Sequence, residues 1–526
     1  MEFVELIAGL LACAVALSWL ARRINVPYPI ALVIGGAALG FLPFGPKVEL
    51  DPNLVLVTIL PPVLYVAALQ TSWRDFKRNL RPITMLAVPL VIVTTLAVAV
   101  VMKLLVPDMP WAVAFALGAI VSPPDAVAAT AVLNRLRMPH RVVTILEGES
   151  LVNDATGLVL YKFAVAAALT GAFSLPDAFG EFFVIAIGGI ALGLILARLS
   201  VAIHARLDDP VIEILLSLLL PYVAYLGAEA MQVSGVLAVV AAGLMRARYA
   251  PEVFTAESRI QVQAVWSAIE FLMNCLAFIL IGLELNDIID DIHAEPKAHL
   301  GWLALAVCMT AVLTRFLWVF TAAFAPRFLN PLLRTDDAYP PWQPVAIVSW
   351  CGMRGIVSLA AVLALPHLLP DGTAFPYRSL VLCLAFAVIL FTLVVQGLTL
   401  APLIRLLHQG TDWSPLEEEQ LAREAMTRAG LAEVDRFSEA ERIPHHISDP
   451  LRSEYEIRLR CVDPRQLAFA DVDNLALRLR SAVVRAERRE LIRLWREEAI
   501  GAEALQSLQR ELDYEEARLN GRRTGS

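Results

Sequence analysis

The sequence predicts an all-α membrane protein with thirteen transmembrane helices in two inverted six-helix repeats, followed by a soluble helical domain at the C-terminus. Of its 526 residues, 58% are apolar and 18% are charged, and the mean hydropathy is +0.64. Soluble globular domains are only about 45–50% apolar. The apolar residues form blocks of roughly 20, the length that a helix needs to cross a bilayer, whereas barrel strands would alternate over about 10 residues.

The thirteen apolar blocks are the predicted spans. They lie at residues 2–21, 26–43, 53–69, 82–105, 110–133, 145–171, 176–203, 209–230, 233–246, 260–285, 299–325, 342–365 and 378–407. The first block follows Met1 directly and carries Glu2 and Glu5 instead of a basic segment. We therefore expect an uncleaved span there and not a signal peptide.

Lys and Arg in the short loops predict the orientation, because they accumulate on the cytoplasmic side. Loops after the odd-numbered spans hold fifteen: Arg22, Arg23, Arg74, Lys77, Arg78, Arg81, Arg135, Arg137, Arg141, Arg206, Arg246, Arg248, Arg259, Arg327 and Arg334. The opposite loops hold three: Lys47, Lys297 and Arg378. This asymmetry predicts an N-terminus outside and a C-terminus in the cytoplasm. The expected location is the cell (inner) membrane.

The composition changes after residue 409, which predicts a membrane domain at 1–409 and a cytoplasmic tail domain at 410–526. The tail carries 24 acidic residues and 19 arginines in 117 residues, and helical periodicity runs from Leu475 to Leu519. One interpretation is an amphipathic hairpin that packs on the membrane domain or on a second copy of itself. The alternative is a ligand-sensing domain, although the tail has no Walker, Rossmann or EF-hand pattern.

The six cysteines predict neither a disulfide framework nor a zinc site. Five of them fall within spans, one is in the tail, and none forms a C-x-x-C pair.

Two spans are broken in the middle by residues that disfavour a helix. Ser122-Pro123-Pro124-Asp125 interrupts the fifth span, and Cys351-Gly352-Met353-Arg354-Gly355 interrupts the twelfth. If spans 1–6 and 8–13 are two repeats, each interrupted span is the fifth of its repeat. The two interrupted spans are seven apart, and because seven is odd they cross the membrane in opposite directions, so the repeats are inverted. Paired interruptions in inverted repeats indicate a transporter with its site at the bilayer midplane. The alternative is that proline and glycine are simply common in membrane helices.

The sixth span carries the charged residues that define the candidate site. An ionisable group at mid-bilayer costs roughly 2.5–3.5 kcal/mol even on the lenient insertion scale, so it is a functional candidate. Glu147, Ser150 and Asp154 are spaced i, i+3 and i+7 and share one helix face. Glu149 and Asn153 occupy the neighbouring face, about 100° away.

Asp154 and Ser150 offer hard oxygen ligands for a small cation, and unwound backbone in the fifth span can add carbonyls. Burial disfavours a charged carboxyl group, so a proton and a cation would compete for Asp154. This chemistry predicts a secondary antiporter and no enzymatic activity. A channel or uniporter is the alternative transporter. An intramembrane aspartyl protease using Asp125 and Asp154 is a third reading, but neither aspartate has the Gly-x-Gly-Asp or Tyr-Asp context.

The remaining charged residues of the membrane domain have expected structural roles. Arg315, in the middle of the eleventh span, needs a partner, and we expect a structural salt bridge to Glu149 that leaves Asp154 free. Arg354 would satisfy carbonyls freed at the breaks, and Asp125 would complement helix N-termini there. Three further glutamates lie near span ends and are expected to be interfacial: Glu213, Glu229 and Glu270.

Several motifs resemble the cation:proton antiporter-1 family, which contains the sodium/proton exchangers and bacterial NhaP-type proteins. The main ones are Glu149-Ser150-Leu151-Val152-Asn153-Asp154, Ser122-Pro123-Pro124-Asp125-Ala126-Val127-Ala128 and Leu60-Pro61-Pro62. Others follow in the family order: Ile281-Gly282-Leu283, Gly352-Met353-Arg354-Gly355 and Phe391-Thr392-Leu393-Val394-Val395-Gln396-Gly397. The resemblance therefore covers nearly all of residues 1–407.

The resemblance implies a thirteen-span homodimer in which spans five and twelve unwind and cross beside the ion, with Pro123, Pro124, Gly352, Arg354 and Gly355 at the crossing. It implies that Asp154 and Ser150 bind Na⁺, and that Glu149 and Arg315 pair. The neutral Asn153 implies electroneutral one-for-one exchange. The candidate ion-binding residues are Asp154, Ser150, Asn153, Asp125 and Ser122.

One position departs from the family pattern. Many members have an acidic residue where this chain has Val66, so K⁺ or Li⁺ remain alternatives to Na⁺. The expected partners are monovalent cations, protons, membrane lipid and a second copy of the chain. No nucleic acid is expected, and no cofactor beyond the transported Na⁺ and H⁺. The expected physiological role is sodium transport and pH homeostasis.

Overall fold

A computed structural model of the chain falls into two compact units, Met1–Asp412 and Trp413–Ser526. It describes residues 2–24, 26–42, 55–136, 138–171, 175–207, 209–254, 256–290, 297–328, 341–370, 372–407, 414–461, 467–497, 508–509 and 511–516. Within these ranges the regular elements are helices, apart from one isolated antiparallel bridge between Leu368 and Ala374. The predicted all-α class is confirmed.

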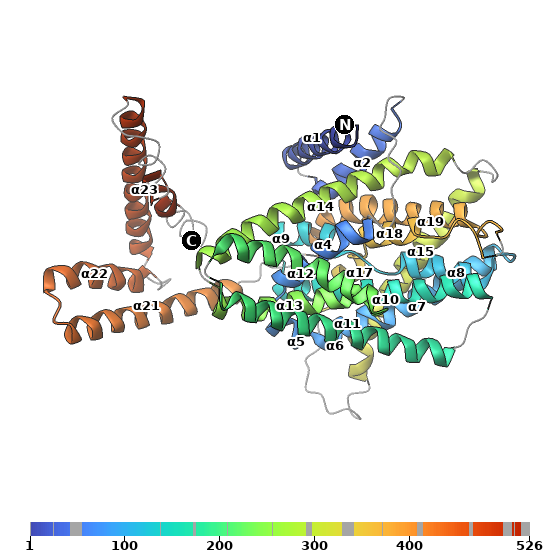
Figure 1. Cartoon of the computed structure of the whole chain (residues 1–526), viewed down its shortest axis with the longest axis horizontal. Coiled ribbons are helices and arrows are strands. Elements are labelled where there is room, and N and C mark those ends of the chain that lie inside the picture. The colour runs from blue at the N-terminus through green and yellow to red at the C-terminus, as the bar shows by residue number, and fades with distance from the viewer. Residues whose placement is uncertain are drawn as a thin grey trace. The chain divides into compact units, whose positions relative to one another are not determined.

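Each predicted span contains one or more helices (Figure 1). The first two are α1 (Glu2–Ile24) and α2 (Tyr28–Gly40), and the third is η1 (Val55–Ile59) with α4 (Leu60–Gln70). After α5 (Trp73–Arg78) come α6 (Leu80–Ala87), α7 (Pro89–Leu105), α8 (Trp111–Val121), α9 (Ala126–Arg135), α10 (His140–Thr170), α11 (Leu175–His204), α12 (Pro210–Ala230), α13 (Gly235–Val253), α14 (Ala256–Asp290) and α15 (Lys297–Phe328). The last two spans are α17 (Trp342–Trp350) with α18 (Ile356–Leu363), and α19 (Arg378–Phe391) with η2 (Thr392–Gln396) and α20 (Gly397–Leu406).

Eight helices among the described residues are long and apolar enough to cross a membrane. They begin at Leu80, Trp111, His140, Gly180, Pro210, Ser258, His299 and Arg378. Two further apolar helices, Tyr28–Gly40 and Val57–Gln70, are shorter. The number of thirteen crossings and the inverted repeats stay predictions.

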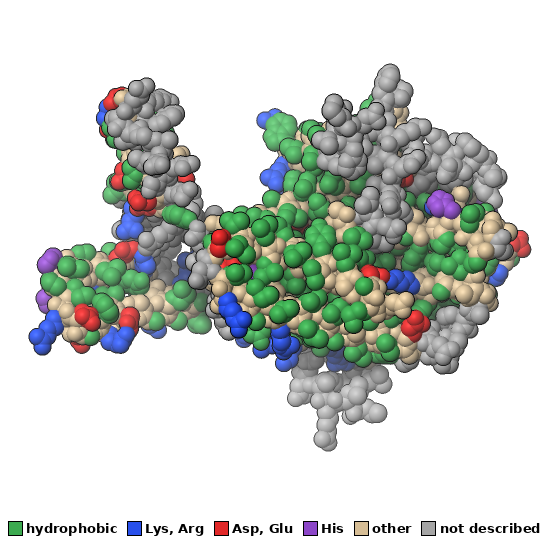
Figure 2. All heavy atoms as spheres, viewed as in Figure 1, with side chains coloured by type: hydrophobic (Ala, Val, Ile, Leu, Met, Phe, Trp, Pro, Cys, Tyr) green, Lys and Arg blue, Asp and Glu red, His purple; other side chains and the backbone are tan. Residues whose placement is uncertain are grey.

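Apolar side chains are spread over most of the described surface of the first unit that is visible in Figure 2, with few charged side chains between them. Helix α11 contributes Val184, Ile187 and Ile195, which are each more than 60% exposed, and α12 contributes Leu215 at 60%. Large apolar side chains exposed at this density indicate contact with an apolar medium, because a water-facing helix carries charges on its outer face.

Both predicted interruptions are present in the backbone. Helix α8 ends at Val121 and α9 begins at Ala126, and α17 ends at Trp350 while α18 begins at Ile356. Three other irregularities were not predicted: a break at Val88, directly before Pro89, and the π-helices η1 and η2 within the third and last spans. Proline explains the first of these, since it removes a donor and clashes with the preceding turn.

Some basic residues assigned to loops by the sequence lie in helices. Helix α13 continues to Val253, so the predicted end at residue 246 was too early. Arg246 is buried and donates hydrogen bonds to Ser200 Oγ at 3.2 Å and to His204 Nε2 at 2.9 Å. These partners on α11 allow the helix to continue past the apolar block with its arginine inside the protein.

Helices α2 and α14 pack with their backbones in contact at two glycines. A Cβ placed on Gly36 would lie 2.2 Å from the carbonyl oxygen of Ile279, and one on Gly282 would lie 2.2 Å from that of Val33. Small residues of this kind permit close helix approach in membrane proteins.

The substitution Gly282→Ala is expected to destabilise the protein by about 1–3 kcal/mol, because the added methyl group forces two backbones apart. The measurement is the thermal unfolding midpoint in detergent, followed by fluorescence-detected size exclusion. The matched control is Gly301→Ala in α15, where a Cβ would meet no atom within 4 Å. Equal midpoints for the two variants would refute the close-packing argument.

The second unit is also helical and is described by itself. It contains α21 (Ser414–Ala440), α22 (His445–Cys461) and α23 (Leu467–Arg496). Helices α21 and α22 are joined by an ion pair between Arg452 and Asp435 at 2.7 Å, and Gly430 packs against the Tyr455 ring. The predicted run from Leu475 to Leu519 lies partly outside the described residues. The choice between a packing role and a sensing role stays open.

Candidate ion-binding site

The site is built around one face of α10. Glu147, Ser150 and Asp154, which share that face, all line a cavity of about 230 Å³. Asp154 is only 6% exposed, and no hydrogen bond to its carboxylate occurs among the described residues. A buried carboxylate without a protein partner is expensive, so it needs a proton or a cation.

Six elements contribute the cavity walls: α2, α4, α9, α10, α14 and α18. The wall from α4 is apolar except for Gln70 at its end. The polar and ionisable residues of the lining are Tyr28, Gln70, Asp125, Thr130, Asn134, Glu147, Ser150, Asp154 and Glu270. The acidic groups share one hollow, so their charges act on whatever enters it.

Asp125 joins the two interrupted spans. Its Oδ1 accepts a hydrogen bond from the Val127 N–H at 2.8 Å, and the carboxylate also accepts one from the Ile356 N–H. The Asp125 N–H donates to the Met353 carbonyl at 2.6 Å. One carboxylate therefore caps the N-termini of both α9 and α18, where the helix dipoles are positive.

Gly355 makes this double cap possible. A Cβ at Gly355 would lie 1.7 Å from Asp125 Oδ2, so only glycine admits the carboxylate at the start of α18. The glycine of the second interruption is thus explained by the aspartate of the first.

Arg354 binds backbone carbonyls at the C-terminal ends of the helices that precede the two interruptions, α8 and α17. Its side chain is 1% exposed. Nε donates to the Val121 carbonyl, the last residue of α8, at 2.8 Å, and Nη1 donates to the Gly352 carbonyl. A cation near two C-terminal ends complements their negative dipoles.

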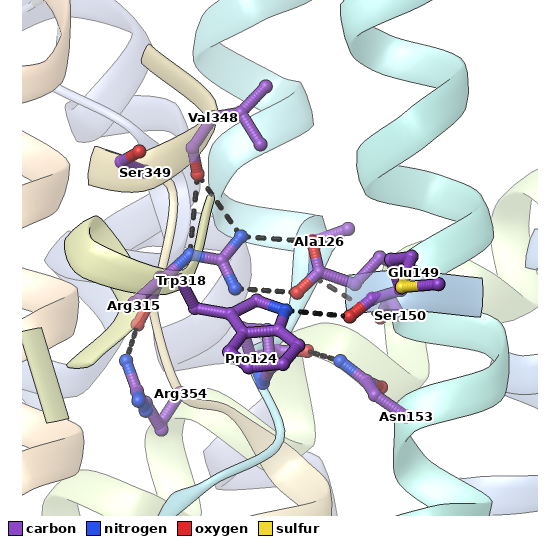
Figure 3. A network of polar contacts seen from close by, with 12 residues as sticks. Pro124, Ala126, Glu149, Ser150, Asn153, Arg315, Trp318, Val348, Ser349 and Arg354 are labelled. Carbon is purple, nitrogen blue, oxygen red and sulfur yellow. Dashed lines mark hydrogen bonds and ion pairs between the residues drawn. The ribbon is translucent and has the colours of Figure 1, made fainter. Parts of the chain in front are cut away.

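Glu149 and Arg315 form a bidentate ion pair in the protein interior (Figure 3). Nη1 lies 2.5 Å from Oε1 and Nη2 lies 2.9 Å from Oε2, with both side chains at most 2% exposed. Arg315 also donates to the Val348 carbonyl of α17, from Nη2 at 3.1 Å and from Nε at 3.3 Å. The pair ties α10 to α15 and α17, and in the described part of the chain no cationic side chain pairs with Asp154.

Ser150 and Asn153 attach α10 to the first interruption (Figure 3). Ser150 Oγ accepts from the Ala126 N–H at 3.3 Å, and Asn153 Nδ2 donates to the Pro124 carbonyl at 2.9 Å. Asn153 is completely buried, and its Oδ1 has no hydrogen-bond partner within the part of the chain that the structure describes. Asn153 is not among the cavity-lining residues.

Ser122 and Pro123 also lie away from the cavity lining. Ser122 Oγ lies 3.3 Å from Thr95 Oγ1 and donates to the Ala119 carbonyl at 3.2 Å, which secures the end of α8. Pro123 packs on α10 at Gly157, where a Cβ would lie 2.3 Å from the proline Cγ. The ion-binding roles assigned to Ser122 and Asn153 therefore rest on the sequence alone.

The comparisons with known proteins place this arrangement in a family. The family model described as "Sodium/hydrogen exchanger, transmembrane" matches residues 9–406. The chain belongs to the sodium/hydrogen exchanger family. The resemblance predicted from the sequence is thereby confirmed, and the family is one of transporters.

Two relatives illustrate how far this exchanger's similarity extends. It is 35% identical over 543 residues to the uncharacterized Na⁺/H⁺ exchanger YjcE of Escherichia coli, covering 97% of this chain and 98% of the relative. It is 35% identical over 387 residues to the sodium, potassium, lithium and rubidium/H⁺ antiporter of Bacillus subtilis, covering 71% of this chain and 57% of the relative.

A solved structure supports the fold of the exchanger. The sodium proton antiporter MjNhaP1 of Methanocaldococcus jannaschii superposes with a TM-score of 0.60 at 19% sequence identity. The match covers 78% of this chain and all of the other. At this identity it shows the fold alone.

The cavity of the exchanger contains a carboxylate, that of Glu270, which was not predicted from the sequence to lie there. Glu270 of α14 was expected to be interfacial, but it lines the cavity and accepts a hydrogen bond from Gln70 Nε2 at 2.9 Å. The sequence around Glu270 does not indicate this position, because Glu270 reaches the cavity only through the packing of α14 against α4. Glu147 was recognisable, since it shares the helix face of Asp154.

The other two glutamates near span ends behave differently from each other. Glu213 is buried and accepts a hydrogen bond from Ser258 Oγ, whereas Glu229 is exposed and pairs with Lys162 at 3.1 Å. Val66 is buried and does not line the cavity.

Proposed function

We propose that this exchanger is a secondary antiporter that exchanges a monovalent cation, Na⁺ in preference to K⁺ or Li⁺, for H⁺ across the cell membrane. The single observation that carries the proposal is Asp154, a buried carboxylate that faces a cavity and has no hydrogen-bond or ion-pair partner among the described residues. In low dielectric such a group is costly when charged and unpaired. A carrier that moves only when Asp154 holds a proton or a cation couples the two fluxes.

The surrounding charges support alternating access at this site. Asp125 and Arg354 neutralise the ends of the broken helices, and Glu149 is neutralised by Arg315. Asp154 is then the charge that changes with each half-cycle. The neutral Asn153 beside it supports an exchange of one cation for one proton without net charge movement.

The choice of Na⁺ rests on the small, hard ligand set of Asp154 and Ser150. The Bacillus subtilis relative is named for four cations, and Val66 removes a carboxylate that many family members have. K⁺ and Li⁺ therefore belong in every assay. We further propose a homodimer with its N-terminus outside and its tail in the cytoplasm.

Everted vesicles that contain the protein test the activity. With an imposed pH gradient, added sodium chloride is expected to dissipate the gradient, and a series of KCl, LiCl and choline chloride at several pH values gives the cation preference. Empty vesicles are the control. If no monovalent cation dissipates the gradient, the antiporter proposal fails.

Electroneutrality is tested in proteoliposomes by clamping the membrane potential with valinomycin and K⁺, using a Na⁺ gradient as the driving force. One-for-one exchange is expected to run at the same rate at zero and at negative potential, because the potential does no work on a neutral cycle. A rate that follows the potential would instead indicate net charge movement. Sodium flux without proton movement would indicate a channel or uniporter.

A further inference from the structure

Two carboxylates in the cavity have no part in the exchange step proposed above: Glu147 on α10 and Glu270 on α14. Both line the same cavity as Asp154, and they lie close enough to interact electrostatically. Among the described residues, neither forms an ion pair with an Arg or Lys side chain, in contrast to Glu149, which pairs with Arg315. Helices far apart in the sequence thus place two acidic groups in one hollow, beyond those of the exchange site.

Exposure along the cavity changes in one direction. Gln70 is exposed, Glu147 and Glu270 are partly buried, and Asp154 is 6% exposed. Gln70, Glu147 and Glu270 therefore form the cavity mouth, and Asp154 lies at its inner end.

The mouth and the inner end are separate places for a cation. Glu147 and Asp154 are seven residues apart on α10, which corresponds to about 10 Å along the helix axis. Oxygen ligands hold a hard cation at short range, roughly 2.3–2.6 Å in the case of Ca²⁺. A cation held at the level of Glu147 is therefore not yet at Asp154.

The side chains of the mouth suit a cation in transit. Gln70 Nε2 donates to Glu270 Oε2 at 2.9 Å, which holds that carboxylate at the mouth. The wall that α4 forms inward of Gln70 is apolar. A cleft with apolar walls and charges of one sign concentrates counter-ions and accelerates their arrival.

We propose that Glu147 and Glu270 form an outer station that captures a monovalent cation at the cavity mouth and passes it to Asp154. The inference rests on the proposed antiport and adds two residues that set the apparent affinity for the cation. The outer station supplies carboxylates from α10 and α14, whereas the residues of α4 that line the cavity supply none.

The test measures initial rates of Na⁺-driven exchange in proteoliposomes with wild type, Glu147→Gln, Glu270→Gln and the double variant. Each single variant is expected to raise the apparent KM for Na⁺ about threefold and the double variant about tenfold, with the maximal rate within about twofold of wild type. The increase in apparent KM should be smaller when choline chloride raises the ionic strength, since salt screens the electrostatic attraction between the carboxylates and Na⁺.

Two controls separate capture from a structural effect. Glu229→Gln removes an equal charge outside the cavity and is expected to leave KM unchanged. Glu270→Asp, which keeps the charge, is expected to recover most of the wild-type KM. Size exclusion in detergent verifies that each variant is folded.

An unchanged KM in the double variant would overturn the outer station, and so would a lower maximal rate at constant KM. A wild-type protein without any cation-driven proton movement would instead overturn the proposed function. The two failures are therefore distinguishable in the same experiment.

Discussion

Proteoliposomes containing Asp154→Asn are expected to show no cation-driven proton movement above that of empty vesicles, while the variant protein stays folded. Asparagine has nearly the shape of aspartate, but it neither takes up a proton in this pH range nor compensates the charge of a cation. The measurement is Na⁺-, K⁺- and Li⁺-driven exchange across several pH values, because one cation or one pH could hide a shifted profile.

Folding is expected to survive because Asp154 has no hydrogen-bond partner among the described residues. Replacing an unpaired buried carboxylate by a neutral amide removes a desolvation cost, so the thermal midpoint should equal or exceed that of wild type. Glu229→Gln is the matched control and should retain exchange. Retained, pH-dependent exchange in Asp154→Asn would contradict the assignment of Asp154 as the exchange site.

Helical periodicity and residue chemistry were sufficient to predict most of α10. The spacing of Glu147, Ser150 and Asp154 predicted a shared face, and the structure brings all three to one cavity. The need of a buried guanidinium for a partner led to Arg315 and Glu149, which lie 2.5 Å apart. Both inferences depend on local geometry or on a strong energetic demand, and these are readable from a sequence.

Features that depend on how helices distant in the sequence cross were harder to predict from the sequence. The sequence indicated that Asp125 and Arg354 lie at breaks, but not that Asp125 caps α9 and α18 together or that Arg354 reaches the Val121 carbonyl. Glu270 joins the cavity only because α14 packs beside α4. Such contacts arise from tertiary packing, which periodicity within one helix does not encode.

The Glu149–Arg315 pair carries the largest expected effect on stability. Arg315→Met leaves a buried carboxylate without its cation, and breaking a buried pair from one side costs about 3–5 kcal/mol. The measurement is the thermal unfolding midpoint in detergent together with the yield of monodisperse protein. Glu149→Gln is expected to cost less, because Arg315 keeps its two hydrogen bonds to the Val348 carbonyl near the negative end of α17.

The double variant Glu149→Gln with Arg315→Met separates a structural pair from an ion ligand. Removing both charges leaves no unpaired ion, so its destabilisation should be smaller than the sum of the two single losses, with a coupling energy of about 1–3 kcal/mol. The stable single and double variants should keep the wild-type apparent affinity for Na⁺, since the bidentate contact uses both oxygens of Glu149. A stable Glu149→Gln protein in which only the cation affinity fell would show that Glu149 is an ion ligand. The assignment of ion binding to Asp154 and of a structural role to Glu149 would then be wrong.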